Sequence, residues 1–383
     1  MALLALLALF VTPTARSAQL RPSALAFFES GTGWNIYAFV QGNNGHLVSN
    51  HFDGTSWSWT DHGLPPGATK IYSPKAITYV DDAGRRRIYV FAISLDGHLV
   101  LLFHKGAGYD WEWANQGGPV LNFNTLSATT FRDDNGVRRI YAFSNAEPHD
   151  GPVYSPLMTR FWDGNNWNWA NMDNWYAGTF TSGTFSEATN YIDTDGHRRM
   201  DVFSGNAPNG EVLRHSWVDG AWTVSNLHGK VSYRGSVVSY LDTSGNRKVD
   251  TYVYDNLANK ISELHDGVWS DRGFPSALAD IPQEYISAIA YADTGGFLHK
   301  DLFAVADGRL YLRAWFDDSW HAWTNLGRPN PSQSVNIHHA AAITYLDTRG
   351  GDRHIWVFVT GNNHLFSKFW NGTSWQWIDL GGL

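Results

Sequence analysis

Histidine, tyrosine, acidic and basic residues gather in short polar segments between the apolar runs of this chain. Candidate acids and bases are His149, Tyr154, Tyr233, His338 and His339. Candidate ligand contacts are Tyr72, Lys75, Glu187, Arg234, Glu284 and Tyr285. A histidine can take the proton beside the carboxylate of a uronic acid, with a tyrosine as the acid, while Arg234 or Lys75 neutralises that carboxylate. Together these residue types would allow β-elimination in an acidic polysaccharide.

Two other kinds of site draw on the same residues. An inverting glycoside hydrolase needs two carboxylates about 6.5–9.5 Å apart, and Glu187 and Glu284 are the candidates. A sugar-binding pocket needs an aromatic side chain beside polar partners, because sugars present apolar C–H faces and ring hydroxyls. Sugar binding alone predicts similar pockets in several repeats, an enzyme predicts one asymmetric charged cleft, and a protein-binding scaffold predicts neither sugar binding nor turnover.

The sequence contains no recognisable motif for a metal or a cofactor. It has no cysteine and no His-Glu-x-x-His, and the adjacent His338 and His339 would point to opposite faces of an extended strand. No serine stands in a Gly-x-Ser-x-Gly setting, and there is no phosphate-binding loop. The net charge of −8 argues against nucleic acid, which requires a clustered basic surface. We therefore expect no metal, no cofactor and no nucleic-acid partner.

A tryptophan-bearing segment followed by a turn recurs seven times, at intervals of roughly fifty residues. The seven copies start at His51, Gly106, Phe161, Trp217, Leu264, Phe316 and Phe369. A period of this length indicates one structural unit repeated along the chain. Because stacked units share a continuous core, we count a single domain over residues 19–383.

Each repeat consists of four short apolar runs separated by turns. In the second repeat the runs are residues 76–80, 87–92, 98–103 and 111–113, and the turns between them are rich in aspartate and glycine. Runs of this length with β-branched and aromatic residues are typical of strands, and no stretch of ten residues has helical periodicity. The sequence therefore predicts an all-β fold, a seven-bladed β-propeller of four-stranded antiparallel blades. The first and last strands fall at repeat boundaries, so ring closure would depend on packing between the first and last blades.

This topology would bring the candidate residues to one end of the ring, which we call the top face. Most of them precede the first strand of a repeat, and the loop 144–156, between a second and a third strand, adds His149 and Tyr154. Loops that converge over a rigid scaffold are the usual place for a ligand. Their departure from the repeat makes these segments the candidate site.

The tryptophans are expected to serve mainly in packing. Trp57 and Trp59 would lie on the same face of an outer strand and cover one blade against the next, while other tryptophans could stack on sugars. Asp201, Asp250 and Asp301 interrupt the second strands of three consecutive repeats. A buried carboxylate requires hydrogen-bond partners, and we expect serine and threonine of adjoining strands to supply them.

The first 18 residues, MALLALLALFVTPTARSA, combine a short apolar run with small residues suited to cleavage after Ser17 or Ala18. This pattern predicts a secretory signal peptide, because the apolar run is too short to span a bilayer. We therefore expect a secreted, extracellular protein without a membrane span. In the absence of cysteine, packing rather than disulfides would hold it together.

The FWDG and WxW motifs, as in FWDGNNWNW from Phe161 and FWNGTSWQW from Phe369, resemble the repeats of secreted seven-bladed β-propeller lectins of fungi and bacteria. The resemblance covers nearly all of the chain after residue 18. It implies carbohydrate binding in pockets at or between blades. Trp222 and Trp269 lack a second tryptophan two residues on, so their repeats would lack a pocket if pockets repeat. We interpret the chain as a carbohydrate-binding protein, with a polysaccharide lyase or glycoside hydrolase as the alternative.

Overall fold

The structure is a computed structural model of the 383-residue chain. It describes residues 21–31, 33–104, 110–122, 125–146, 156–172, 185–205, 211–218, 220–228, 232–255, 258–275, 286–330, 335–347 and 351–383. The predicted signal peptide, His149, Tyr154, Glu284 and Tyr285 lie outside these residues, as do the side chains of Tyr233 and Arg234.

The described strands form seven antiparallel sheets, each made of consecutive strands. Blade 1 contains β1 (Ser23–Glu29), β2 (Gly33–Gln41), β3 (Leu47–Phe52) and β4 (Trp57–Asp61); blade 2 contains β5 (Ile71–Val80), β6 (Arg86–Ser94), β7 (Leu99–His104) and β8 (Trp111–Gly117). Blade 3 contains β9 (Ser127–Arg132), β10 (Arg138–Asn145), β11 (Leu157–Trp162) and β12 (Trp167–Asn171); blade 4 contains β13 (Ser186–Ile192), β14 (Arg198–Gly205), β15 (Val212–Val218) and β16 (Ala221–Asn226). Blade 5 contains β17 (Ser232–Leu241), β18 (Arg247–Asp255), β19 (Lys260–His265) and β20 (Val268–Gly273); blade 6 contains β21 (Ile286–Ala292), β22 (Leu298–Ala306), β23 (Arg309–Phe316), β24 (Ser319–Trp320) and β25 (Thr324–Gly327). Blade 7 contains β26 (Ile337–Leu346), β27 (Arg353–Gly361), β28 (His364–Trp370) and β29 (Trp375–Gly382).

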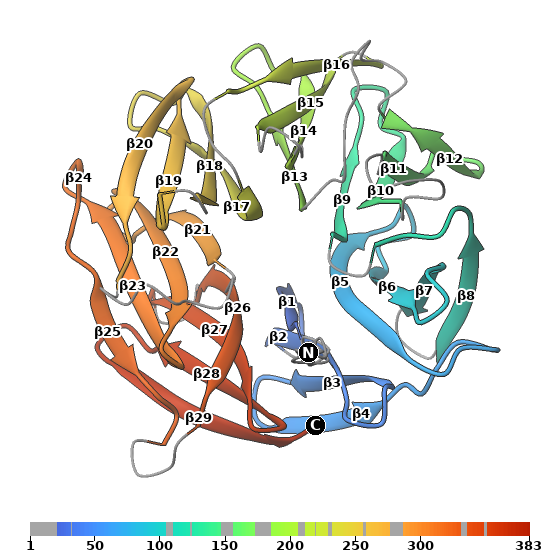
Figure 1. The fold of residues 1–383 in the computed structure, drawn as a ribbon, viewed down its shortest axis with the longest axis horizontal. Coiled ribbons are helices and arrows are strands. Elements are labelled where there is room, and N and C mark those ends of the chain that lie inside the picture. Colours follow the sequence, from blue (N-terminus) through green and yellow to red (C-terminus); the bar gives the residue numbers. More distant parts are fainter. Residues whose placement is uncertain are drawn as a thin grey trace, which may run out of the picture.

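The seven sheets stand radially around a central axis, with the first strand of each blade innermost (Figure 1). This arrangement confirms the predicted all-β, seven-bladed propeller. Blade 6 departs slightly from the prediction, because its outer strand is interrupted and both β24 and β25 pair with β23. The described residues contain no helix long and apolar enough to cross a membrane.

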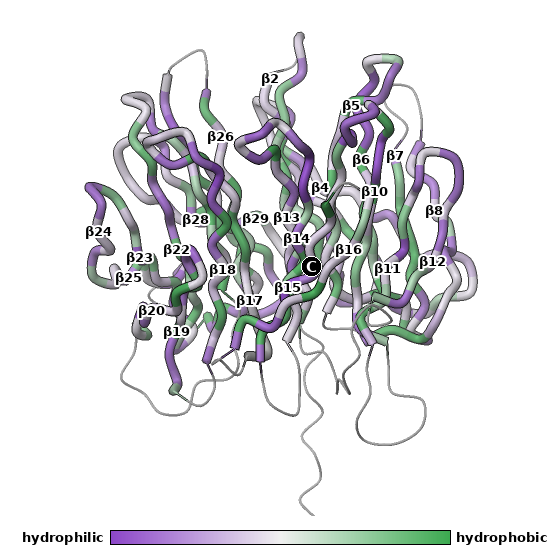
Figure 2. The backbone as a smooth tube through the Cα atoms, turned by 90° about the horizontal axis from the view of Figure 1, so that it is seen from above, coloured by the Kyte–Doolittle hydropathy of each residue, from purple (hydrophilic) through white to green (hydrophobic). Residues whose placement is uncertain are grey.

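The core lies between neighbouring blades. Hydrophobic segments occupy the middle of the strands, and hydrophilic turns occupy the rim (Figure 2). The second strands are the most buried elements; in β2, for example, Ile36, Ala38, Phe39 and Val40 are fully buried. Burial on both faces explains why these strands read as continuous apolar runs rather than alternating ones.

In six blades, the first tryptophan of the outer strand packs edge-on against an aromatic ring of the preceding blade. Trp167, for example, meets Phe91 at a centroid distance of 6.1 Å and an interplanar angle of 74°. The same contact joins Trp57 to Phe358, Trp111 to Phe39, Trp222 to Phe143, Trp320 to Tyr252 and Trp375 to Phe303. Edge-to-face pairs are favourable because the positive ring edge meets a negative π face. Blade 5 has no tryptophan at this point, because the residue two before Trp269 is Gly267, which lies in the turn.

The second tryptophan of each outer strand joins neighbouring blades by a hydrogen bond. Trp113 Nε1, for example, donates to the carbonyl oxygen of His62 in blade 1 at 2.9 Å. The equivalent bonds run from Trp59 to Leu380, Trp169 to Gln116, Trp269 to Leu227, Trp323 to Arg272 and Trp377 to Leu326. In blade 4 the equivalent residue is Val224, which cannot donate. The predicted packing role of the tryptophans is therefore confirmed for both positions of the motif.

Candidate functional site

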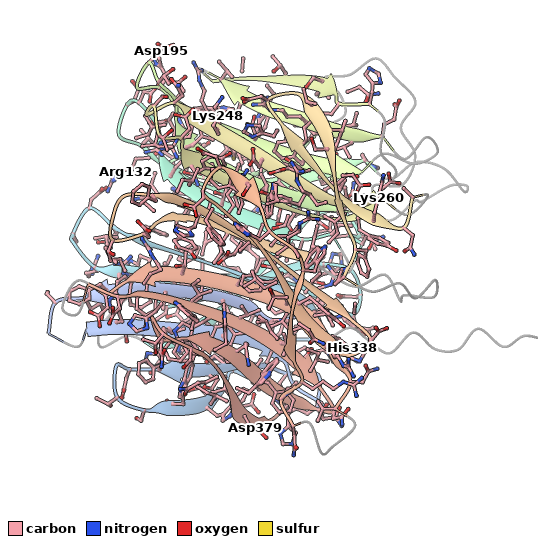
Figure 3. All side chains as sticks on the ribbon, turned by 90° about the vertical axis from the view of Figure 1, so that its left-hand side faces the viewer. Arg132, Asp195, Lys248, Lys260, His338 and Asp379 are labelled. Atoms are coloured by element: carbon pink, nitrogen blue, oxygen red, sulfur yellow. The ribbon has the colours of Figure 1, made fainter. Side chains whose placement is uncertain are left out.

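The ring has two distinct faces. On the top face the segment before a first strand bonds to the preceding blade, as in Ile71 N to Gly45 O and Leu121 N to Gly97 O. The segments before first strands and the turns between second and third strands therefore share this face, as predicted. The bottom face carries the turns between first and second strands. In Figure 3, His338 and Lys260 lie toward one face, and Arg132 and Asp195 lie toward the other.

The structure brings three of the predicted site residues to the top of the central channel. Lys75, Glu187 and His339 line one cavity of 180 Å³, and Lys75 Nζ lies 3.3 Å from Glu187 Oε1. His338 and Tyr72 are half-buried on the neighbouring backbone and do not line this cavity. The strand is not extended at the histidine pair, because His339 has a φ of 38° and occupies a bulge. Their roles in ligand binding or catalysis stay predictions.

A larger cavity that the repeat pattern did not indicate lies between blades 5 and 6. It has a volume of 420 Å³ and opens among bottom-face turns at Asp242 and Asp318. Trp315 and Trp320, which pair across β23 and β24, form its aromatic wall. Tyr240 of blade 5 also lines it. We call this cavity the blade 5–6 pocket.

Lys300 lies at the floor of the blade 5–6 pocket, with a side chain only 5% exposed. Its Nζ donates to Asp250 Oδ2 at 2.8 Å and to Glu263 Oε1 at 3.0 Å. The same ammonium faces the rings of Trp315 at 4.9 Å and Trp320 at 5.4 Å. A lysine is rarely buried unless anionic partners replace its hydration, and both carboxylates do so here.

Glu263 completes the floor. It accepts from Tyr252 Oη at 2.9 Å, from Arg272 Nε at 2.6 Å and from Trp320 Nε1 at 3.1 Å. Burial disfavours its ionised form, but Lys300 and Arg272 outweigh burial and lower the pKa of Glu263 to about 2. The carboxylate is therefore ionised at neutral pH and is held by a network that spans two blades.

The blade 5–6 pocket arises where the chain departs from its own repeat. The residue equivalent to Lys300 is apolar in every other blade: Ile36, Ile88, Ile140, Met200, Val249 and Ile355. The first residue of a second strand is an arginine in blades 2, 3, 4, 5 and 7, and Leu298 in blade 6. In blade 3 that arginine, Arg138, covers the ring of Tyr79 at 4.7 Å. With Leu298 in its place, Tyr240 faces Lys300 instead, at 5.4 Å.

A second cavity occupies the equivalent place between blades 2 and 3. Its volume is 820 Å³, and Trp162 and Trp167 stand where Trp315 and Trp320 stand in blade 6. Among its charged residues, Arg132 pairs with Asp82, and Arg139 and Asp81 are 24% and 17% exposed. Two inter-blade pockets with paired indoles therefore lie on the bottom face. Of these two, only the blade 5–6 pocket has a floor of buried charged side chains.

The three aspartates of the second strands are buried and hydrogen-bonded. Each accepts from the tyrosine one residue before the end of the first strand in its own blade: Tyr191 to Asp201, Tyr240 to Asp250 and Tyr291 to Asp301. Serine contributes only at Asp201, through Ser216 at 2.6 Å. The predicted structural role is thus confirmed, with tyrosine rather than serine or threonine as the common partner. Burial raises the pKa of Asp301 to about 6.

The described residues contain no group of three or more histidine, aspartate or glutamate side chains arranged to hold a metal ion. The blade 5–6 pocket presents aromatic surface, an ammonium, a guanidinium and carboxylates. Such a set can bind a polar ligand with an apolar face.

The chain matches no family model and no curated protein. Its fold is similar to solved β-propeller lectins. BP39L lectin from Burkholderia pseudomallei aligns with a TM-score of 0.65 at 14% identity, over 95% of this chain and 99% of that one. A mutant of Aleuria aurantia lectin in complex with α-methyl-L-fucoside aligns with a TM-score of 0.53 at 16% identity, over 94% of both chains. AofleA from Arthrobotrys oligospora aligns with a TM-score of 0.54 at 12% identity, over 81% of this chain and 87% of that one.

At these identities the likeness establishes the architecture. The resemblance to β-propeller lectins of fungi and bacteria is confirmed at that level. The fold of the Aleuria aurantia lectin is described as six-bladed, whereas this chain forms seven blades.

Proposed function

We propose that this chain is an exported carbohydrate-binding protein that holds a glycan in pockets between neighbouring blades. The observation that supports it is the blade 5–6 pocket, in which two indoles stand beside a buried lysine and glutamate. Indole faces stack on the C–H face of a sugar, and charged groups bond its hydroxyls. The cavity is within the size range of small-ligand pockets, roughly 300–1,000 Å³. The lectin architecture of the similar structures, one of them with a fucoside bound, supports the same ligand class.

The test is titration calorimetry of the purified protein with α-methyl-L-fucoside, preceded by a glycan array to find other sugars. We expect saturable binding and no product. Trp315→Ala should weaken binding at the blade 5–6 pocket at least tenfold, because it removes the stacking surface. Trp370→Ala is the matched control: Trp370 holds the same hairpin position in blade 7, where Ile355 replaces the lysine. Equal affinity in Trp315→Ala and the wild type would place the sugar elsewhere, and an array without binding would refute the function.

Export through the predicted signal peptide is part of the proposal. Expression of the full chain in a secretory host should yield a protein in the medium whose first residue follows Ser17 or Ala18, as measured by intact mass. Retention of the apolar segment Ala2–Val11 would contradict it.

We propose no catalytic function. Of the two carboxylates considered for a hydrolase, only Glu187 falls within the described residues.

A further inference from the structure

The residue that precedes the first-strand motif occupies one position around the top of the central channel in every blade. It is serine in four blades: Ser23, Ser127, Ser236 and Ser287. Blade 7 has Ala341, blade 2 has Lys75 and blade 4 has Glu187. Lys75 and Glu187 therefore interrupt a ring of small residues with two opposite charges. Blade 3, which lies between them, has the small Ser127 at this position, and the two charged side chains form an ion pair.

The serines of this ring join neighbouring blades by accepting a backbone N–H. Ser23 Oγ accepts from Ala76 N at 2.9 Å, and Ser287 Oγ accepts from Ala342 N at 3.0 Å. Ser236 Oγ accepts from Ala288 N in the same way, at 2.9 Å. A hydroxyl that accepts through its lone pairs keeps its proton for donation. All three serines line the channel cavity, so three hydroxyl donors are fixed at its wall.

The charged residues of the cavity are mostly cationic. Lys75 and Arg21 line it, together with the imidazole of His339, and Glu187 is the one carboxylate among the lining residues. The side chains of Lys75 and Glu187 are 32% and 28% exposed. An ion pair this accessible to water is weak, so a competing anion can exchange with one partner. Glu187 is thus the protein's own carboxylate in a cavity that is rich in hydrogen-bond donors.

We propose that the top of the central channel binds a small sugar acid, whose carboxylate takes the place of Glu187 beside Lys75. The hydroxyls of Ser23, Ser236 and Ser287 would bond the ligand's oxygens, and the displaced Glu187 would accept from one of its hydroxyls. The cavity of 180 Å³ is below the roughly 300–1,000 Å³ of drug-sized sites, which limits the ligand to about one sugar unit. This site is separate from the inter-blade pockets and does not depend on the function proposed for them.

The experiment is calorimetric titration with sodium D-glucuronate, with D-glucose as the uncharged control. We expect glucuronate to bind at least tenfold more tightly than glucose, and added salt to weaken it. Lys75→Met should reduce glucuronate affinity at least tenfold. Glu187→Gln should increase it severalfold, because it removes the internal competitor and keeps the shape. Thermal unfolding of both variants checks that the ring is intact.

Opposite effects of the two variants are the signature of the site. The proposal is overturned if neither the wild type nor Glu187→Gln binds glucuronate, if Glu187→Gln binds it no more tightly, or if Lys75→Met binds it as the wild type does. Trp315→Ala separates this site from the blade 5–6 pocket: it should leave glucuronate binding unchanged. Loss of glucuronate binding in that variant alone would move the acid to the blade 5–6 pocket.

Discussion

Trp59 Nε1 donates a hydrogen bond of 2.6 Å to the carbonyl oxygen of Leu380, a residue 321 positions further along the chain. The bond joins the outer strand of blade 1 to the outer strand of blade 7. The same bond recurs at five other contacts between blades, for example from Trp113 to His62. Ring closure therefore uses the device that joins consecutive blades, as the sequence predicted when it placed both chain ends at repeat boundaries.

Trp59→Phe should destabilise the protein by about 1 kcal/mol from the lost hydrogen bond, plus a smaller packing loss. Urea unfolding followed by tryptophan fluorescence measures this change. Trp113→Phe is the control, because it removes the equivalent bond between blades 1 and 2. Similar losses in both variants are expected; a much larger loss in Trp59→Phe alone would show that the closing contact is special.

Lys300→Met should destabilise the protein by about 3–5 kcal/mol, because it leaves the buried carboxylates of Asp250 and Glu263 without their shared cation. Lys368→Met is the matched control. Lys368 is also buried, but its ammonium faces the ring of Trp377, at 5.0 Å. That variant should change the free energy of unfolding by less than about 1 kcal/mol, since methionine keeps the packing. Comparable losses would contradict a charge-based role for Lys300.

Asp301→Asn should make stability less dependent on pH. The pKa of Asp301 rises from 3.8 to about 6 on folding, so the folded state binds this proton more tightly than the unfolded state. Its contribution is fully present below pH 4 and is lost as pH rises through 6, a loss of about 3 kcal/mol. The asparagine variant should therefore gain stability relative to the wild type between pH 4 and pH 7.5. Thermal unfolding at the two pH values measures this.

The control for that experiment is Asp250→Asn. Asp250 accepts from Lys300 and Tyr240, so its amide variant should lose stability at pH 7.5. If Asp301→Asn also loses stability at pH 7.5, the carboxylate has a favourable partner when ionised.

Leu298→Arg should weaken glycan binding in the blade 5–6 pocket at least tenfold. It restores the arginine that other blades have at this point, and its side chain would enter the pocket beside Tyr240. Calorimetry against the glycan found by the array gives the affinity. Leu298→Met, which keeps the size and lacks the charge, should bind as the wild type does. Unchanged binding in the arginine variant would show that the ligand avoids this side of the pocket.

The architecture could be predicted from sequence because its signals are local. Strand-sized apolar runs, Asp-Gly turns and the tryptophan motif recur at a fixed period, and each blade is made of consecutive strands. The blade 5–6 pocket was missed because its charged side chains, Asp250, Glu263, Arg272 and Lys300, come from four strands of two blades. Lys300 and Glu263 nevertheless had a signal, since each puts a charge in a buried run. Aligning the repeats position by position would have found Lys300 among six apolar equivalents.

The sequence predicted which residues lie on the top face, but it did not predict how their side chains pair. The pairing of Lys75 with Glu187 depends on the diameter of the channel and on side-chain reach, which no local pattern contains. The aspartates were correctly expected to have hydrogen-bond partners. Their common partner, a tyrosine ten residues earlier, follows from antiparallel register and could have been derived from the strand lengths.

The construction of every blade from consecutive strands also bears on how the chain folds. In the described strands, the sheet hydrogen bonds join residues close in sequence, so contact order within a blade is low and the loop-closure entropy is small. A chain synthesised from its amino end can complete each blade as that blade emerges. One long-range step remains for the end, when blade 7 docks on blade 1 and Leu380 reaches Trp59. Termination of synthesis before blade 7, whose first strand begins at Ile337, would therefore leave an open arc of complete blades.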